Sequence, residues 1–378
     1  MKPALGGINV SLSTLVFSLG SMKFNFPLLK TIRILLLPFS LVYALIVFIR
    51  NRLFDLKIFG SVTFNMPIIC VGNLAAGGTG KSPMVEFLIK KLKDQFRVAV
   101  LSRGYKRKTR GYALADAQST ALDVGDEPMQ FHLKFPTVPI AVGEERMVAV
   151  PQLLHDRPGT QVIILDDAFQ HRSVKAGLNI LLTDCNNLYT RDWFLPTGDL
   201  RDERRSYKRA QIIVVTKCDH DFSLKERNDI IRELKPTEDQ DIYFSYIDYG
   251  KPYHILSQET FTIDRTIEVL LVTGIANPDP LKKFVEENFQ AYYEIDYSDH
   301  HIFSIDDLKM IQKRFESIQS GKKIILTTEK DAVRLVKFKQ ELISLPFYVI
   351  PIEPGFLFHD EQRFADLIVT FIRNFNYQ

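Results

Sequence analysis

The segment from Ala75 to Ser82 reads AAGGTGKS, and it constrains the fold more than any other part of the chain. It follows a short apolar run, Pro67 to Val71, and precedes a helical pattern that begins near Ser82. A strand, a glycine-rich turn and a helix in this order form a P-loop, whose backbone N–H groups and helix N-terminus surround a polyphosphate. Alanine stands at the first glycine position of the motif. We therefore expect an α/β nucleotide-binding fold.

Each residue type in this loop suits a phosphate site. Glycines can turn successive N–H groups inward, the lysine can reach the terminal phosphates, and the serine hydroxyl can ligate magnesium. We expect the nucleotide to lie against the whole loop, with the lysine also acting in catalysis: Ala75, Ala76, Gly77, Gly78, Thr79, Gly80, Lys81 and Ser82.

Short apolar runs recur along the chain after the P-loop. They are rich in Val, Ile and Leu and do not alternate with polar residues, a pattern typical of a parallel sheet covered on both faces. From about Val269 the same order of strand and helix repeats. We expect a P-loop-type, mostly parallel sheet flanked by helices over residues 61–245, and a smaller C-terminal α/β lobe over residues 246–378 with a linker between Phe244 and Ile267. The first set of runs lies at 97–102, 137–142, 161–167, 179–184 and 211–217.

The residues before the P-loop domain include an uncharged apolar run at 34–49. Basic residues flank it on both sides, and we expect Pro38 to bend it. Residues 22–60 are therefore predicted to form an N-terminal membrane anchor helix, and the alternative is a helix buried in a soluble core. The sequence leaves open whether Met1 or Met22 is the true start, and whether the helix spans the membrane or only inserts.

Composition excludes some functions. The net charge of +3 is too small for nucleic-acid binding through bulk electrostatics, so we expect no nucleic-acid partner. The three cysteines show no C-x-x-C or similar metal-ligand spacing, which fits a reduced cytosolic compartment. Any basic binding site must therefore be local.

Two pairs of neighbouring carboxylates are candidates for metal or acid–base chemistry. Asp166 and Asp167 end an apolar strand, where a Walker-B carboxylate would reach magnesium, although they could instead cap a following turn. Asp126 and Glu127 lie in a turn before a helical segment. The alternative for this pair is a helix N-terminus with Asp126 as the cap.

Basic residues gather at 103–108 and again at 201–209. Charge runs are usually solvated surface. The first run, however, begins at the carboxyl end of a strand, where α/β sheets bind ligands, so an anionic substrate is a serious alternative. For that substrate we expect Arg103, Lys106 and Arg107 to contact a phosphate group.

Two further motifs bear on function. His300 and His301 follow Asp299, and a histidine pair of this kind is more often structural than catalytic. The run TKCD at 216–219 follows a strand and resembles the guanine-binding motif of many GTPases. Against a GTPase, the segment that begins at Asp166 lacks the glycine of a D-x-x-G switch.

The chain resembles the tetraacyldisaccharide 4'-kinase family of lipid A biosynthesis, through motifs that extend to at least Leu335. In order, these are VGNLAAGGTGKSP, LSRGYKRK, GDEPMQF, DDAFQHR, LRDERRS, SDHHIF and TTEKDAVRL. The resemblance implies a two-lobed P-loop kinase that uses ATP and Mg²⁺. It implies that the acceptor is an acylated glucosamine disaccharide 1-phosphate lipid, phosphorylated on its 4'-hydroxyl. It also implies attachment to the membrane surface, on the cytoplasmic face of the inner membrane.

Residue roles come with this resemblance. Asp126 paired with His300 resembles the family's catalytic base. The metal ligands are expected at Ser82, Glu127, Asp166 and Asp167. Contacts with the acceptor are expected at Arg103, Tyr105, Lys106, Arg107, Arg146, Gln170, His171 and Arg201.

The chain departs from the family pattern in three places. Ser82 replaces the commoner Thr but keeps the hydroxyl, and Ala168 replaces the usual Gly. Asp202 and Glu203 stand where the family usually has Glu-Pro. Two other functions remain as alternatives: a membrane-associated P-loop GTPase, and a membrane-tethered nucleotide-binding regulator that transfers no phosphate to a lipid.

Overall fold

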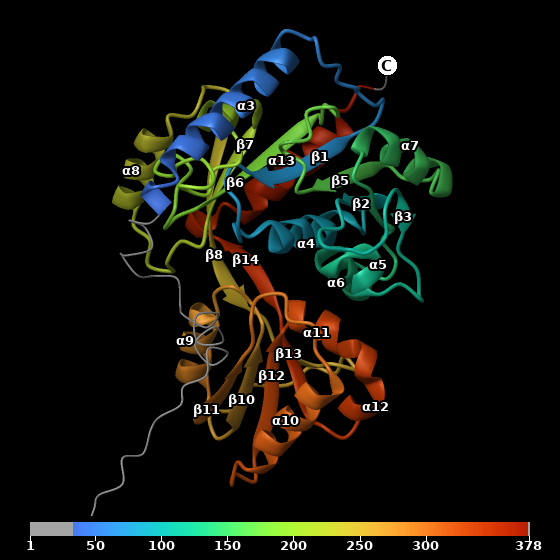
Figure 1. The fold of residues 1–378 in the computed structure, drawn as a ribbon, viewed down its shortest axis with the longest axis vertical. Helices are drawn as coiled ribbons and strands as arrows, with labels where there is room; N and C mark the ends of the chain where they lie inside the picture. Colours follow the sequence, from blue (N-terminus) through green and yellow to red (C-terminus); the bar gives the residue numbers. More distant parts are fainter. Residues whose placement is uncertain (1–32, 377–378) are drawn as a thin grey trace, which may run out of the picture.

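The computed structural model describes residues 33–376, which form two α/β lobes (Figure 1). The larger lobe is built on a nine-stranded sheet with the order β14-β8-β7-β6-β1-β5-β2-β4-β3. All strands between the two edges are parallel, and the edge strands β14 and β3 are antiparallel to their neighbours. This confirms the predicted fold class. The strands are β1 Ile68–Asn73, β2 Val98–Ser102, β3 Ala113–Leu114, β4 Ile140–Val142, β5 Val162–Asp166, β6 Leu178–Asp184, β7 Ile212–Thr216, β8 Asp241–Tyr249 and β14 Ile352–Phe356.

Both faces of this sheet are buried. Successive residues of β1 alternate between two hydrophobic clusters, with Ile69 and Val71 on one face and Ile68 and Cys70 on the other. Because neither face meets water, the central strands are apolar without alternation. Residues of α4, α6 and α13 belong to the first cluster, and residues of α7 and α8 to the second. The helices are α4 Lys81–Leu92, α5 Ala121–Val124, α6 Asp126–Lys134, α7 Arg146–Asp156, α8 Leu224–Leu234 and α13 Glu361–Arg373, with a 3-10 helix, η1, at Arg204–Arg209.

The smaller lobe has a five-stranded sheet with the order β11-β10-β12-β13-β9, in which only the edge strand β9 is antiparallel among the described residues. Its two faces also carry separate hydrophobic clusters. The strands are β9 Tyr253–His254, β10 Glu268–Thr273, β11 Ala291–Asp296, β12 Lys323–Thr328 and β13 Phe347–Ile350. The helices are α9 Asp279–Asn288, α10 Ile305–Glu316, α11 Glu329–Leu335 and α12 Lys339–Leu342, and a short 3-10 helix lies at Val336–Phe338. Another short 3-10 helix, Leu357–His359, follows β14 and belongs to the larger lobe.

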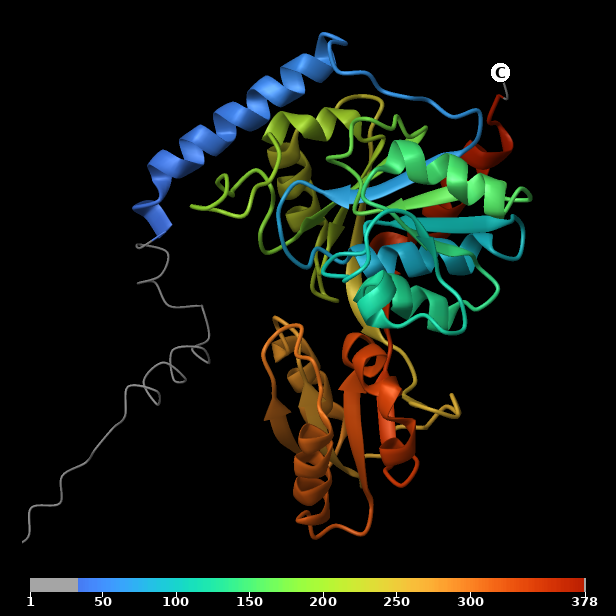
Figure 2. The same ribbon diagram turned by 45° about the vertical axis from the view of Figure 1, so that its right-hand side comes forward.

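The chain passes between the lobes twice, once between β8 and β9 and again between β13 and β14 (Figures 1 and 2). The backbone N–H of Gly250 donates to the carbonyl of Pro351 (3.0 Å), so the two passages lie side by side. A paired connection of this kind joins the lobes through two adjacent chain segments.

The domain boundaries expected from the sequence differ from this path. Residues 244–249, which we expected to belong to a linker, continue β8 in the larger sheet. We also assigned all of 246–378 to the smaller lobe, whereas β14 and α13 return to the larger one. β14 is the edge strand and β8 is its neighbour, and both are only partly buried, which admits polar residues. β14 also contains Pro354 and Gly355, which are typical of edge strands rather than central ones.

The N-terminal apolar segment forms α3, Leu37–Asp55, which lies along the outside of the larger lobe (Figures 1 and 2). Within the described residues it is the one helix long and apolar enough to cross a membrane. Only Ser40, Val47 and Asn51 of this helix are buried, so it is not a core helix. Pro38 lies in the first turn of α3, and a turn at Leu35 and Leu36 separates this helix from the helical residues Arg33 and Ile34, so the helical path is interrupted next to Pro38. The question of the start residue lies outside the described part of the chain.

Candidate active site

The P-loop joins β1 to α4 with its central residues exposed. Gly77 and Gly80 have positive φ angles of 110° and 81°, which glycine adopts without steric strain. The two alanines at the start of the motif are engaged within the protein. Ala75 is buried, and the N–H of Ala76 donates to the carbonyl of Asp199 (2.6 Å), so this N–H is already engaged. The inward-turned donors must therefore come from later in the loop.

Contacts with other residues of the larger lobe hold the rest of the loop in place. The hydroxyl of Thr79 accepts a hydrogen bond from the Asn73 amide (2.8 Å). Ser82 is buried in the first turn of α4, and Gly78 is exposed with open space around it. A side chain at Gly78 would meet no neighbouring protein atom. The absence of a side chain there lets a ligand approach the backbone closely.

Lys81 lies beside two groups from other loops. Its Nζ is 3.4 Å from the carbonyl of Gly77 and 3.9 Å from the carboxylate of Asp167. Arg201 donates to Asp167 through both terminal nitrogens and also to the side chain of Asn73. Burial alone would raise the pKa of Asp167, but the charges of Lys81 and Arg201 hold that pKa below its usual value. Asp167 also has a positive φ of 47°, a strained conformation of the kind that clusters at functional sites.

Asp166 differs from its neighbour in its electrostatics. It is buried at the end of β5 and accepts a hydrogen bond from the Ser102 hydroxyl (2.8 Å). Burial, followed by the charge of Asp167, raises the pKa of Asp166 to about 6. A buried carboxylate next to another negative charge is a setting that a divalent cation would stabilise.

The four expected metal ligands offer hard oxygen atoms, which suit magnesium. Among the described residues, no three Asp, Glu, His or Cys side chains form a ready-made metal cage. Glu127, on α6, lies 3.5 Å from Lys330 of α11.

Asp126 and His300 meet across the two lobes. Asp126 is the first residue of α6, and His300 lies in the loop after β11. Nδ1 of His300 is 2.9 Å from Oδ2 of Asp126. The side chain of Asp126 forms no capping bond to α6, so interpreting it as a helix cap is wrong. His300 has a positive φ of 63°, a strained backbone conformation at the point of contact.

A third residue at this contact, Arg334 of α11, was not singled out from the sequence. Its Nη2 is 2.7 Å from Oδ2 of Asp126 and 3.1 Å from Nδ1 of His300. Burial would raise the pKa of Asp126, but the hydrogen bond and charge of Arg334, and then those of His300, hold that pKa below its usual value. The motif TTEKDAVRL contains Arg334, but nothing in its spacing connects it with α6.

Two of the arginines expected to bind the acceptor instead face the protein. Arg107 pairs with Glu144 (2.6 Å), and its side chain is 2% exposed. Arg146 is fully buried and donates to the backbone carbonyls of Gly143 and Asp166. Burial lowers the pKa of Arg146 to about 10. Because both guanidinium groups are engaged by neighbouring loops, they hold the site together and are not open to a lipid phosphate.

Three other residues of the expected acceptor site are exposed on the loop after β2. These are Arg103, Tyr105 and Lys106. The ring of Tyr105 lies 6.2 Å from that of His300, measured between centroids, and Nζ of Lys106 lies 5.5 Å from the centroid of the Tyr105 ring. This loop therefore extends towards the contact between the lobes.

Gln170 and His171 lie after Asp167, in the loop that follows β5. Gln170 donates to the carbonyl of Asn73 (2.7 Å), and so helps to fix the end of β1. Burial, followed by the charges of nearby arginines, lowers the pKa of His171 to about 4, so this imidazole is neutral at pH 7.

The TKCD run follows β7 and supports the P-loop. The hydroxyl of Thr216 donates to the carbonyl of Thr79 (3.0 Å), and Lys217 pairs with Asp184 at the end of β6 (2.7 Å). These contacts give the run a structural role that does not require guanine.

A cavity of about 620 Å³, which sequence reasoning missed, lies between α3 and the segment before η1. Its walls are mostly apolar, and charged residues line one part of it. The lining includes Leu37, Leu41, Leu45 and Phe48 from α3, Trp193 and Phe194 from the facing loop, and Glu203, Arg204 and Arg205.

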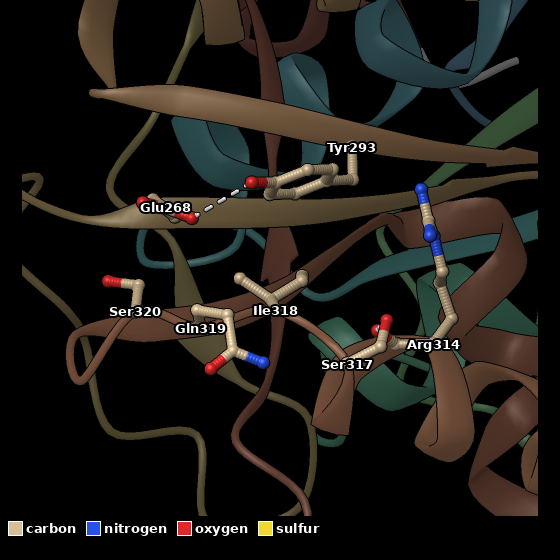
Figure 3. Close-up of a pocket in the computed structure, with 7 residues that line it drawn as sticks. All are labelled: Glu268, Tyr293, Arg314, Ser317, Ile318, Gln319 and Ser320. Carbon is tan, nitrogen blue, oxygen red and sulfur yellow. Dashed lines mark hydrogen bonds between the residues drawn. The ribbon is translucent and has the colours of Figure 1, made fainter.

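A second cavity, of about 300 Å³, lies in the smaller lobe (Figure 3). The hydroxyl of Tyr293 donates to Glu268 within it (3.3 Å), and Arg314 lines it as well. Glu268 begins β10, whereas His300 lies beyond the carboxyl end of the neighbouring β11. This cavity is therefore near the amino ends of the strands, whereas the Asp126–His300 contact lies beyond their carboxyl ends.

Comparison with known proteins shows what this arrangement is similar to. The family described as Tetraacyldisaccharide-1-P 4'-kinase matches residues 32–373. A tetraacyldisaccharide 4'-kinase of Bacteroides thetaiotaomicron is 43% identical over 354 residues, covering 89% of this chain and 93% of that protein. One of Flavobacterium johnsoniae is 44% identical over 351 residues, covering 91% and 98%. The crystal structure of LpxK from Aquifex aeolicus in complex with ATP matches with a TM-score of 0.71 and 26% identity, over 90% of this chain and 99% of that one. The chain therefore belongs to the tetraacyldisaccharide-1-P 4'-kinase family.

Proposed function

We propose that the chain transfers the γ-phosphoryl group of ATP to the 4'-hydroxyl of a tetraacyldisaccharide 1-phosphate lipid. The main support is the meeting of two groups of residues around one P-loop. Lys81, Asp166 and Asp167 gather at the strand ends of the larger lobe, and Asp126 contacts His300 of the smaller lobe nearby. Family membership and the ATP complex of the Aquifex aeolicus relative support the same reaction.

In this reaction the P-loop N–H groups and Lys81 hold the β- and γ-phosphates. Asp126 accepts the proton of the 4'-hydroxyl while that oxygen forms its bond to the γ-phosphorus. The bond between the γ-phosphorus and the oxygen of the β-phosphate breaks, and ADP leaves. His300 orients the Asp126 carboxylate through their hydrogen bond.

Magnesium would neutralise charge on the phosphates, and Ser82, Glu127, Asp166 and Asp167 are the residues that would hold it. The raised pKa of Asp166 supports this assignment, since the charge of a bound cation would offset the burial and the repulsion from Asp167 that cause the shift. Arg201 already binds Asp167 and would lie close to the transferred group.

The acceptor lipid would reach the site from the membrane along α3. The exposed apolar side chains of this helix support insertion into the cytoplasmic face of the inner membrane, because ATP is available on that side. The 620 Å³ cavity between α3 and Trp193 would accommodate acyl chains, and Arg204 and Arg205 offer charge to a headgroup phosphate.

The test is phosphate transfer with purified full-length protein, γ-labelled ATP or GTP, and the disaccharide 1-phosphate lipid in detergent micelles. We expect label in the lipid with ATP and none with GTP. Label released as free phosphate from GTP would support the GTPase, and nucleotide binding without lipid labelling would support the regulator.

A further inference from the structure

We propose that Arg334 is a positioning residue for phosphoryl transfer, which holds Asp126 of the larger lobe in line with His300 of the smaller lobe. The inference rests on the proposed function, because it takes Asp126 as the group that receives the hydroxyl proton. Three observations carry it: the geometry of the guanidinium contacts, the way Arg334 itself is anchored, and the oxygen of Asp126 that these contacts leave open.

The guanidinium of Arg334 bridges the two lobes. Its side chain is 6% exposed, and Nη2 lies 2.7 Å from Oδ2 of Asp126. Nη1 faces the other way, 3.2 Å from Oδ1 of Asp331 and 3.4 Å from the carbonyl of Gly274. The planar fork therefore uses one nitrogen within the smaller lobe and the other across the lobe contact, a geometry that a lysine cannot reproduce.

Arg334 is anchored by the same backbone position as His300. The carbonyl of Gly274 accepts from the N–H of His300 (3.2 Å) as well as from Arg334. The N–H of Gly274 donates to Asp331 (3.0 Å), which is fully buried and also accepts from the hydroxyl of Thr328 (2.7 Å). Because both groups are fixed to the residue that follows β10, the smaller lobe presents His300 and Arg334 to Asp126 as one rigid unit.

The contacts at Asp126 are directed at one oxygen. Arg334 donates to Oδ2, and Nδ1 of His300 lies 2.9 Å from the same atom. Within the described part of the chain, no hydrogen bond to Oδ1 of Asp126 is present. When Nδ1 of His300 carries the proton, Oδ2 accepts from two donors, which fix the rotation of the carboxylate and leave Oδ1 to receive a proton from the substrate hydroxyl.

Structural stabilisation alone explains this pair poorly. Burying an ion pair costs solvation free energy that the mutual attraction often does no more than offset. Among the described residues, two other ion pairs join the lobes, from Lys134 to Glu329 (2.5 Å) and from Lys330 to Glu127 (3.5 Å). Neither of these lysines contacts Asp126 or His300 in the structure, so Arg334 alone among these cations can set the geometry of the pair.

The experiment measures kcat and both KM values for Arg334→Gln, Arg334→Lys and the control Lys337→Gln in full-length protein. Lys337 is an exposed cation within one turn of Arg334. For Arg334→Gln we expect kcat to fall on the order of 10²-fold, with the KM for ATP nearly unchanged, because the lost effect is on alignment and not on nucleotide binding. Arg334→Lys should recover only part of the loss, and the control should match the wild type.

A second comparison shows whether Arg334 acts through Asp126. In an Asp126→Asn background, Arg334→Gln should cause little further loss of kcat, because there is no longer a carboxylate to position. Equal losses in both backgrounds, or a folded Arg334→Gln or Arg334→Lys with wild-type kcat, would overturn the proposal. If thermal unfolding shows that Arg334→Gln does not fold, the effect of Arg334→Lys on kcat is compared in both backgrounds instead. Wild-type kcat in Asp126→Asn would overturn both the assignment of Asp126 as the base and the role of Arg334, whereas absence of ATP-dependent lipid labelling by the wild type would contradict the proposed function itself.

Discussion

Lys81 makes few contacts with the protein around it. Among the described residues, its ammonium makes close contacts with the Gly77 carbonyl and the Asp167 carboxylate, and burial lowers its pKa. A lysine of this kind supplies charge to a phosphate rather than packing to the core. We therefore expect Lys81→Ala to reduce phosphoryl transfer by about 10²-fold or more, while the free energy of unfolding changes by less than about 1 kcal/mol.

The measurement pairs kcat with thermal unfolding of the same preparation. Lys93→Ala is the control, since Lys93 is an exposed cation at the end of the same helix and pairs with its neighbour Asp94. Parallel losses of activity and stability in Lys81→Ala would show that this lysine has a structural role.

From the sequence we could predict which residues form the P-loop, but not which side chains contact one another in the fold. The P-loop was predictable because its strand, glycines, lysine and helix are consecutive, and the turn geometry depends on local backbone angles. Arg146 and Arg107 illustrate the limit. Each lies in a basic or polar context in the sequence, but only the fold decides that Arg146 is buried against β5 and that Arg107 pairs with Glu144.

At the scale of elements, α3 has two apolar surfaces with different neighbours. Leu41 and Leu45 line the cavity that faces Trp193. Phe39, which is 67% exposed, does not line it. The same is true of Val42 and Ile46.

Deleting the residues through about Arg52 should release the protein from membranes and weaken catalysis on a micellar acceptor. The physical reason is the loss of the exposed apolar surface that lies beside the site. Sedimentation with lipid vesicles and kcat/KM for the lipid are the measurements. Complete membrane association of the truncated protein would place the anchor elsewhere, for example in the basic loop from Arg103 to Arg110.

Point substitutions separate the two surfaces without removing the contacts that α3 makes with the larger lobe. Replacing Phe39, Val42 and Ile46 together by Ser should lower vesicle binding on the order of 10²-fold or more, because each loses buried apolar area in the membrane. Replacing Leu41 and Leu45 by Ser should mainly raise the KM for the lipid. Equal effects of the two sets on vesicle binding would contradict separate roles.

Elements with local sequence signals were predictable, and those defined by distant pairing were not. β1 and β5 are continuous apolar runs, so both were expected as buried strands. β14 has the sequence IEPGF, with a proline and a glycine, and its place beside β8 depends on a partner about a hundred residues earlier in the chain. For the same reason, no local pattern connects Arg334 with Asp126.

At the scale of the molecule, the contact between the lobes includes a buried charge cluster. Lys134 of α6 pairs with Glu86 of α4 and with Glu329 of α11, each at 2.5 Å. Gln130 donates to Glu86 (2.7 Å). Burial, followed by the charge of Glu329, raises the pKa of Glu86 to about 7. Two carboxylates thus share one lysine in a nearly dry setting.

This cluster predicts a pH dependence of stability. Because the pKa of Glu86 is raised in the folded state, the folded protein binds more protons than the unfolded chain between about pH 4.5 and 7, so stability falls as the pH rises through that range. Glu86→Gln should remove this term. The stability of the variant relative to the wild type should therefore increase by about 2 kcal/mol between pH 5 and pH 8, measured by urea unfolding. A difference that does not vary with pH would show that Glu86 is ionised throughout.

The catalytic pair is the feature that makes the two lobes one functional unit. Asp126 and His300 are brought together only by the packing of α6 against the smaller lobe, with Arg334 as their common neighbour. Groups that act as a unit show strongly non-additive losses, because removing either one already disables the other. We expect Asp126→Ala and His300→Ala each to lower kcat by about 10²-fold or more with little change in the KM for ATP, and the double variant to be barely worse than the poorer single one. His301→Ala is the control, since His301 contacts Asp307 within its own lobe and stacks on Tyr297. If the two losses simply multiplied, His300 would be a separate contact with the substrate, and the proton would leave the hydroxyl without a paired base.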